Sequence, residues 1–352
     1  MNLFMKNITI MLWLLLLNGY MAFSGSSPQD TTALITGLFD DENYLEIRIV
    51  TDIDTLLRDK SENPSYHKSR LSYKNSDSTW SSLDADIRVR GNFRKQSENC
   101  DFPPLKLRID KKNRTNTIFE NTRELKVVTH CQSDLPEYEQ YVIQEYLIYR
   151  MYSILSDISY NTRLLKVTYI DKNDPDLTFK KFAFFLEDPD VMEERLNGQM
   201  LNLQTVDPDE IDRDYYLIIS FFHYLIINTD WSLPILHNID LFSLDYFKPP
   251  IPIPFDFDWS GLINIPYKVP TVAGMQVRVP ERIYKGPCLK KKDIKKIKQL
   301  FQEKKTQLFD VYIDCPFLEE KYKMETLQNL QIFYQILDDK YIFDNTFVEQ
   351  CK

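Results

Sequence analysis

The sequence predicts an α+β fold of two lobes, in which an antiparallel sheet lobe with one main helix precedes a mainly helical lobe. Three observations support this prediction. The first half contains short β-rich segments around one long helical segment, and the second half contains apolar and amphipathic helical patterns. The chain has 352 residues, of which 43% are hydrophobic and 13% aromatic, which is enough for a sizeable core.

Six segments of the first half are strand-like, because apolar and polar residues alternate or β-branched residues are frequent. Asp134, Pro136 and Glu137 mark the start of a helix that reaches about Leu155. The polar residues 58–80 are expected to form a long loop. The expected strands are 44–50, 83–91, 104–109, 124–130, 162–170 and 179–187.

The second half begins after the EDPD sequence at 187–190, which is typical of a break between elements. Asp207, Pro208 and Glu210 are expected to cap a helix that reaches Ile227. The later part of this helix is apolar nearly all round, so we expect it to be buried. Further expected elements are a strand at 236–244, an amphipathic helix at 290–305 and a last helix at about 319–338.

The N-terminus has the pattern of a secretory signal peptide. Lys6 precedes an apolar run, and Ala22 and Ser24 stand three and one positions before the expected cleavage. The apolar core is about half of the ~20 residues of a membrane span. We therefore expect a secreted or periplasmic protein without stable membrane insertion after processing, although the segment can also stay as an anchor. The expected domains are the signal peptide 1–24, a β-rich lobe 25–188 and a helical lobe 189–352.

Charge and cysteine content narrow the possible partners. A net charge of −9 at pH 7 argues against general nucleic-acid binding. Five cysteines in an oxidising compartment suggest one or two disulfides. We favour Cys100–Cys131 and Cys288–Cys315, although spacing does not fix connectivity. His130 beside Cys131 resembles half a metal site, but no second pair has ligand spacing, so a structural role is preferred.

Two aspartates lie in one of the most apolar stretches, PIPFDFDWSGLIN at 252–264. In a strand, Phe255 and its aromatic neighbours would share one face, and Asp256 and Asp258 would share the other. Two like charges this close repel each other unless something neutralises them. A bound cation would do so, and the alternative is an exposed turn whose acids face water.

These aspartates complete an ordered set of polar residues. A buried helix is followed by Asp230, eight residues later by Asn238, and one hairpin later by Asp256 and Asp258. Helix, Asp, Asn, strand, turn, strand, Asp is the layout of a protein kinase catalytic loop and its metal aspartate. Asp230 would orient the substrate hydroxyl and accept its proton. Asn238, Asp256 and Asp258 would supply the oxygen ligands that Mg²⁺ requires.

The first half offers the other parts of such a site. Lys106 lies on the strand face opposite Leu105 and Leu107. Glu145 lies on a helix stripe among tyrosines and aliphatic residues, where a carboxylate needs a partner. A strand lysine paired with a helix glutamate positions the nucleotide phosphates in kinases.

Seven motifs in this order resemble the spore coat CotH-type kinases, most closely their secreted bacterial relatives. This family of atypical secreted protein kinases implies a two-lobed protein-kinase-like fold that binds ATP with Mg²⁺ or Mn²⁺. By position, Asp230 resembles the catalytic aspartate, and Asn238 and Asp256 resemble the metal ligands. Lys106 resembles the phosphate lysine, with Lys126 as a rival. The motifs, within residues 83–265, are IRVRGNFR, PPLKLRI, LKVVTHCQSD, RLLKVTYID, NTDW, HN and PFDFDWSG.

The sequence also departs from the kinase pattern. RVRGNFR stands where a glycine-rich phosphate loop is expected, and Arg90 and Arg94 are its candidate phosphate contacts. Asp230 does not follow His-Arg, and its distance from Asn238 is longer than in protein kinases.

Three functions remain open at this point. The first is transfer of the ATP γ-phosphate to Ser or Thr of an exported protein. The second is an inactive kinase-like module that binds a partner or glycan at the cell surface. The third is another ATP-dependent transfer, such as adenylylation. The Asp/Asn/Asp set favours an enzyme, whereas the missing glycine loop and the scarcity of ATP outside the cytoplasm favour a binding module.

Overall fold

The computed structural model describes residues 37–263, 265, 271–272, 275–276 and 281–349. The predicted signal peptide, residues 1–24, lies outside the described residues. The strands are β1 Leu45–Thr51, β2 His67–Lys74, β3 Trp80–Val89, β4 Leu105–Arg108, β5 Glu124–Val128, β6 Thr162–Asp171, β7 Thr178–Leu186, β8 Gln199–Leu201, β9 Ile239–Ser243, β10 Ile251–Pro254, β11 Thr271–Val272 and β12 Met275–Gln276. The helices are α1 Ile53–Arg58, α2 Lys111–Arg114, α3 Glu137–Leu155, α4 Pro189–Leu196, η1 Pro208–Glu210, α5 Arg213–Leu225, α6 Lys291–Ile313, α7 Glu320–Asp338, α8 Lys340–Phe343 and η3 Asp344–Val348.

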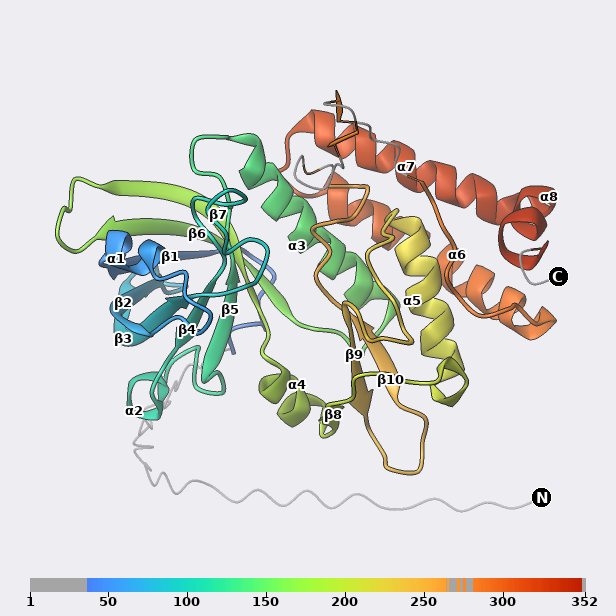
Figure 1. Cartoon of the computed structure of the whole chain (residues 1–352), viewed down its shortest axis with the longest axis horizontal. Helices are drawn as coiled ribbons and strands as arrows, with labels where there is room; N and C mark the ends of the chain where they lie inside the picture. The colour runs from blue at the N-terminus through green and yellow to red at the C-terminus, as the bar shows by residue number, and fades with distance from the viewer. Residues whose placement is uncertain (1–36, 264, 266–270, 273–274, 277–280, 350–352) are drawn as a thin grey trace, which may run out of the picture. The chain divides into compact units, whose positions relative to one another are not determined.

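The first seven strands form a closed barrel in the order β1-β2-β3-β4-β5-β7-β6 (Figure 1). Neighbouring strands are antiparallel except at one place. There β1 runs parallel to β6, from the Leu45–Leu165 pair to the Thr51–Asp171 pair. This single parallel pairing joins the first strand to the sixth and closes the sheet.

The predicted fold class is therefore wrong. The chain does not form a two-lobed kinase-like fold with an antiparallel sheet lobe, but a closed seven-stranded mixed barrel with helices packed beside it. The predicted strands themselves exist, since each of the six expected segments overlaps one of β1, β3, β4, β5, β6 and β7. The error lies in their pairing, because an open sheet and a barrel require the same alternation along each strand.

Residues 58–80 are not the expected long loop, because they contain β2 and the first residue of β3. In β2, Ser69, Leu71 and Tyr73 point into the barrel and their neighbours point outward. The Ser69 hydroxyl is buried and donates to the carbonyl of Ala85 at 2.9 Å. A polar residue thus occupies an inward position, which hid the alternation in the sequence.

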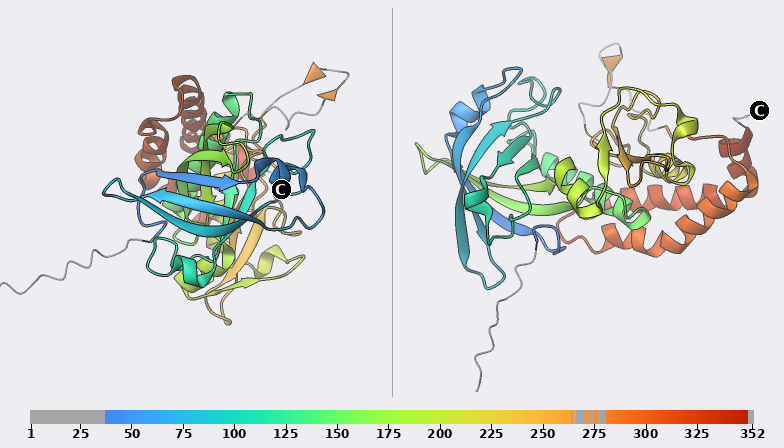
Figure 2. Two further views of the ribbon diagram at one scale, coloured as in Figure 1. Left: turned by 90° about the vertical axis from the view of Figure 1, so that its left-hand side faces the viewer. Right: turned by 90° about the horizontal axis from the view of Figure 1, so that it is seen from below.

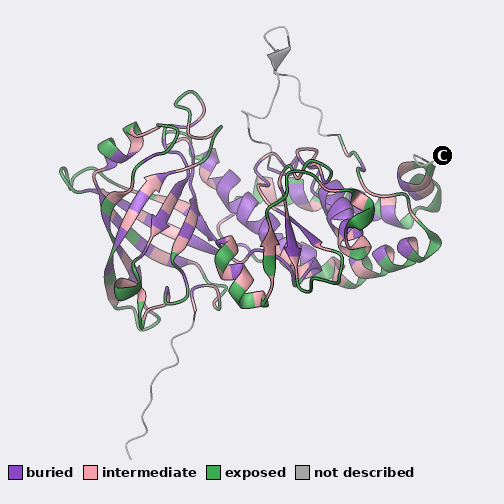
Figure 3. Ribbon diagram, turned by 60° about the horizontal axis from the view of Figure 1, so that its bottom comes forward, coloured by how far each residue is buried: buried purple, intermediate pink, exposed green. Residues whose placement is uncertain are grey.

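The barrel interior is one hydrophobic cluster, and a second cluster lies outside it among the helices. Helix α3 belongs to the second cluster and contacts β6 and β7 on one side and α6 on the other (Figure 2). Most of its residues are buried, as the purple colour along α3 shows (Figure 3). α3 therefore connects the barrel wall to the helical part of the chain.

The expected helices of the second half are confirmed as α5, α6 and α7, with one shifted start. Asp207 caps the short turn η1, and α5 begins only after its own cap, Asp212. The later part of α5 is buried, as predicted, with Phe221 and Phe222 fully enclosed. Helix α5 packs on β10, which pairs with β9 in the small sheet β10-β9-β8. No helix in the described ranges is both long and apolar enough to span a bilayer.

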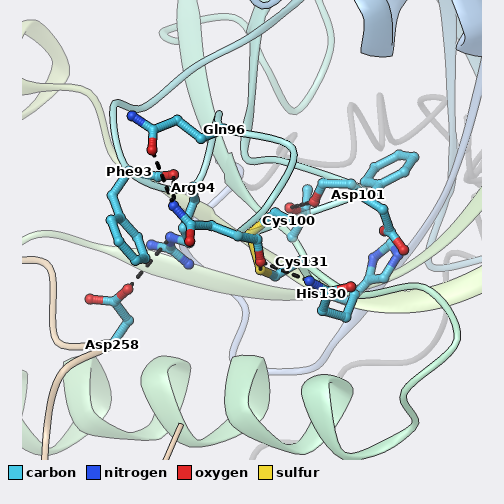
Figure 4. Close-up of a disulfide and its surroundings, with 12 residues drawn as sticks. Phe93, Arg94, Gln96, Cys100, Asp101, His130, Cys131 and Asp258 are labelled. Carbon is cyan, nitrogen blue, oxygen red and sulfur yellow. Dashed lines mark hydrogen bonds and ion pairs between the residues drawn. A yellow bond between two sulfur atoms is a disulfide. The ribbon is translucent and has the colours of Figure 1, made fainter. Parts of the chain in front are cut away.

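The cysteines follow one of the two expected pairings. Cys100 and Cys131 form a disulfide, as predicted. Cys288 is also disulfide-bonded, but Cys315 is a free, buried thiol, so the expected Cys288–Cys315 pair is wrong. The Cys100–Cys131 bond connects the loop between β3 and β4 to the chain just after β5 (Figure 4).

We predict that the double change Cys100→Ser, Cys131→Ser lowers the free energy of unfolding by about 2–4 kcal/mol, because the bond closes a loop across a sequence separation of 31 residues. The denaturant m-value should rise in urea unfolding, because the uncrosslinked unfolded chain exposes more surface. Cys315→Ala, which removes a free thiol, should leave the m-value unchanged. An unchanged m-value in the double variant would contradict this account.

Candidate functional site

Three carboxylates surround the guanidinium of Arg94, which lies on the loop between β3 and β4. Arg94 Nη1 is 3.6 Å from Glu145 Oε2 on α3, and Nη2 is 3.4 Å from Asp256 Oδ1. Its Nε is 3.5 Å from Asp258 Oδ2, as Figure 4 shows. Arg94 was a predicted phosphate contact, whereas in the structure its guanidinium lies between three acidic side chains.

Two contacts fix the loop that carries Arg94. The Cys100–Cys131 disulfide anchors its later part, beside Arg94 in Figure 4. The ring of Phe93 packs edge-on against Trp259 with centroids 6.0 Å apart. Since Trp259 directly follows Asp258, this contact holds the Arg94 loop onto the segment that carries both aspartates. The same segment is pinned to the end of α5, where the Gly261 N–H donates to the Ile227 carbonyl at 3.0 Å.

Glu145 is the most deeply buried acid of this cluster, with 3% of its side chain exposed. Burial raises its pKa to about 8, and the charges of Asp258 and Asp256 act in the same direction, whereas Arg94 opposes the shift. Near neutral pH the protonated form is therefore favoured. The predicted partner of Glu145 was Lys106, but the structure gives it Arg94.

Asp256 does not lie in a strand, so the expected separation of aromatic and acidic faces over 255–259 is wrong. Strand β10 ends at Pro254, and Asp256 has a φ of +58°, in the left-handed region. Its backbone N–H donates to the hydroxyl of Tyr149 on α3 at 2.9 Å. The reversal leaves the Asp256 side chain 46% exposed, while Asp258 is 10% exposed. Aspartate and asparagine tolerate this backbone conformation better than most residues.

Asp230 and Asn238 are brought together, as expected from their spacing. The Asn238 side-chain amide donates to Asp230 Oδ2 at 2.9 Å and to the Asp230 carbonyl at 2.8 Å. His237 Nε2 lies 3.0 Å from Asp230 Oδ1, so both carboxylate oxygens have a hydrogen-bond partner. The Phe255 N–H donates to the Asn238 carbonyl at 3.1 Å, which sets Asn238 at the end of the hairpin where Asp256 follows.

Lys106, the predicted phosphate lysine, already has two acidic partners. It forms ion pairs with Glu124 and, at 3.6 Å, with Asp188, the cap of α4. Its cross-strand neighbour is Lys126, the rival candidate. Burial lowers the pKa of Lys126, and the charge of Arg90 lowers it further, against the attraction of Asp188 and Asp240. Lys126 is thus a cation in a poorly hydrated place that forms no ion pair with any described residue.

Arg90 lies between the two groups of charges. Burial lowers the pKa of its guanidinium, while the field of Asp256 raises it and that of Arg94 lowers it again. The same arginine repels Lys126. Arg90 is therefore within electrostatic reach of both Lys126 on the barrel side and Asp256 after β10.

Sequence reasoning missed Asp240, Tyr160 and Tyr149. The hydroxyl of Tyr160 donates to Asp240 Oδ2, and burial raises the pKa of Asp240. Asp240 lies in β9, whereas Asn238 precedes the strand and has a φ of +55°, so strand alternation does not place the two side chains on one face. The sequence therefore offered no signal for Asp240, and the tyrosines looked like ordinary core residues.

The donor set suits a hard divalent cation in chemistry, since carboxylate and amide oxygens are the ligands of Mg²⁺ and Mn²⁺. In the present arrangement, Arg94 is the cation that balances Asp256 and Asp258. Within the described residues, no group of three or more His, Cys, Asp or Glu side chains is arranged to hold a metal.

We predict that Glu145→Gln raises the free energy of unfolding increasingly as the pH rises from about 5 to 8. Below the ordinary pKa of 4.5, Glu145 is protonated in both the folded and unfolded states. Above it the unfolded state loses the proton, whereas the folded state keeps it up to about pH 8. The wild type should therefore lose about 1.4 kcal/mol of stability per pH unit from this group.

Urea unfolding of both proteins across this pH range measures the difference. Glu139→Gln, a change on the same helix at a carboxylate paired with Lys181, is the matched control. A difference between Glu145→Gln and wild type that does not change with pH would contradict the raised pKa.

Comparison with known proteins gives no function for this chain, so a functional proposal has to rest on the side chains described above. No protein-family model matches the chain, and no curated protein matches its sequence.

Proposed function

We propose that the chain is an exported, metal-dependent protein phosphotransferase, similar in chemistry to the CotH-type kinases, which moves the γ-phosphate of ATP to a Ser or Thr hydroxyl of another exported protein. One observation carries the proposal. Arg90 interacts electrostatically both with Lys126 of β5 and with Asp256, which follows the β9–β10 hairpin, so cationic groups and a carboxylate come together around it. A metal–triphosphate needs both kinds of group at one place.

Lys126 is better suited than Lys106 to bind phosphate. The charge of Lys106 is already balanced by Glu124 and Asp188. Lys126 is partly removed from water, which disfavours its charged form, and it forms no ion pair with a described carboxylate. A bound anion would stabilise this charge. Arg90 adds a second cation close to it, with the planar donor geometry that matches phosphate oxygens.

The residues that would hold Mg²⁺ or Mn²⁺ are Asp256 and Asp258, with the side-chain oxygen of Asn238. The metal would offset negative charge on the phosphates when it is bound. Arg94 would then share these carboxylates with the metal. Glu145 would hold Arg94 from the other side, since its oxygen lies 3.6 Å from Arg94 Nη1.

Asp230 is the residue proposed to orient the attacking hydroxyl and accept its proton. Its side chain is 30% exposed, so a substrate can reach it. Asn238 and His237 fix its two oxygens. Each carboxylate oxygen has two lone-pair directions, so each retains one for a substrate hydroxyl.

The same hydrogen bonds favour a second candidate, a module that binds nucleotide without transfer. An aspartate whose two oxygens are both held by neighbouring side chains can act as a fixed part of a binding site and need not accept a proton. The two functions differ in whether bound ATP is turned over, so the variants below separate them.

We predict that Lys126→Met weakens binding of ATP with Mn²⁺ at least ~10-fold, whereas Lys106→Met weakens it less than ~3-fold. Loss of one charge-assisted contact of about 1.5–3 kcal/mol gives this difference. Calorimetric titration of the full chain measures it, and EDTA should abolish binding. Lys126→Met should also keep or raise thermal stability, because it removes a half-buried charge that forms no ion pair with a described carboxylate. Equal effects of the two changes would contradict the assignment of Lys126 as the phosphate-binding lysine.

We predict that Asp230→Asn slows phosphate transfer by ~10²–10⁴-fold, the usual span for a positioned base, and changes ATP affinity little. Asparagine has nearly the same size and keeps one acceptor oxygen. The assay is incorporation of labelled γ-phosphate into the chain itself and into co-exported proteins, beside a binding titration. If the wild type binds ATP tightly but transfers no phosphate, and Asp230→Asn behaves identically, the chain is a binding module.

A further inference from the structure

A cavity of about 690 Å³ lies on the outer wall of the barrel over β1, β6 and β7. None of its lining residues belongs to the candidate site described above. Its floor follows the strand register: Arg48, Thr168 and Lys180 are aligned in one row across the three strands. Glu46, Lys166 and Phe182 form the next row. These are outward positions of strands whose alternate residues fill the barrel (Figure 3).

The cavity is basic although the chain carries a net charge of −9. Four basic side chains line it, against two acids. Both acids are already engaged: Glu46 pairs with Lys74 at 2.8 Å, and Glu139 pairs with Lys181 at 3.2 Å. The remaining basic residues form no ion pair with any described residue. They are Arg48, Lys166 and Lys180.

Aromatic rings hold two of these cations in place. The guanidinium of Arg48 lies 3.9 Å from the ring centroid of Trp80, which also lines the cavity. The ammonium of Lys166 lies 4.2 Å from the centroid of Tyr44 and 4.5 Å from that of Phe317. A cation that rests on a ring loses less side-chain freedom when it binds a ligand, so these donors are partly preorganised.

The outer wall of the barrel presents side chains to a ligand, but no free strand edge. Because the barrel is closed, β1, β6 and β7 have neighbours on both sides, so an extended peptide has no free strand edge to pair with. A suitable ligand must itself present many polar groups to the Thr168 hydroxyl and the basic side chains, together with negative charge. A saccharide with acidic substituents has both, and its apolar ring faces can pack on Trp80 and Phe182.

We propose that this cavity binds an acidic saccharide, a sugar chain that carries carboxylate or sulfate groups. The site would attach the protein to anionic glycans independently of any phosphotransferase activity. Arg48, Lys166 and Lys180 bind the acidic groups, and Thr168 binds a hydroxyl.

Calorimetric titration of the full chain at 150 mM salt tests the proposal with four hexamers: galacturonate, sulfated heparin, neutral cellohexaose and hexaglutamate. We expect one of the two acidic saccharides to bind and the neutral one not to bind. Arg48→Gln with Lys180→Gln should weaken that binding at least ~10-fold. Lys292→Gln with Lys295→Gln removes the same charge from an exposed face of α6 and should change it less than ~2-fold.

Thr168→Glu is a second variant, which puts a carboxylate between Arg48 and Lys180 and should also abolish binding. Thermal melting of each variant tests whether it is folded. Three outcomes overturn the proposal. The first is that neither acidic saccharide binds. The second is that both double variants lose affinity equally, which indicates general charge attraction. The third is that hexaglutamate binds more tightly than the saccharides, which indicates a site for an acidic peptide.

Discussion

The ion pairs of Arg94 are the constraint on which the candidate site depends. Burying an acidic side chain is costly without a polar partner, whether it is ionised, as expected for an aspartate, or favoured in the neutral form, as Glu145 is near neutral pH, and Glu145 and Asp258 are both largely removed from water. Arg94 reaches both of them and Asp256, so one guanidinium connects a barrel loop, helix α3 and the segment after β10. The position of the loop is therefore as important as the acids themselves. The disulfide and the Phe93–Trp259 contact fix it from two sides.

Local patterns predicted most of the elements but not their arrangement. The amphipathic helices and the alternating strands depend on residues near one another, which periodicity can detect. Barrel closure depends on β1 lying parallel to β6, more than a hundred residues later in the chain. Nothing in the alternation of either strand distinguishes this partner from an open edge. Strand β2 was missed for a local reason, because its inward Ser69 interrupts the apolar pattern.

The candidate site was predictable where the chain itself brings residues together. Asp230 and Asn238 both precede β9, so their proximity follows from a short, tight connection. Partners from different elements were not predictable. Lys106 and Lys126 face each other across β4 and β5, and sequence alone could not show that Glu124 and Asp188 already balance Lys106. The left-handed backbone of Asp256 was hidden for a similar reason, since it depends on a hydrogen bond to Tyr149 of α3.

Positive and negative charges lie on different sides of the candidate site. On the barrel side, Lys126 and Arg90 repel each other, and the pKa of Asp240, which attracts Lys126, is raised by burial, so positive charge is in excess there. On the hairpin side, the two carboxylates of Asp256 and Asp258 contact the one guanidinium of Arg94, so negative charge outnumbers positive charge in this group. Glu145 adds little to that excess near neutral pH, because its raised pKa favours the neutral form. A ligand that carries a phosphate group and a bound cation would complement both sides at once, whereas a simple anion or a simple cation would satisfy only one. The two halves of the site are therefore best explained together, as a surface for a metal-bound phosphate rather than for either ion alone.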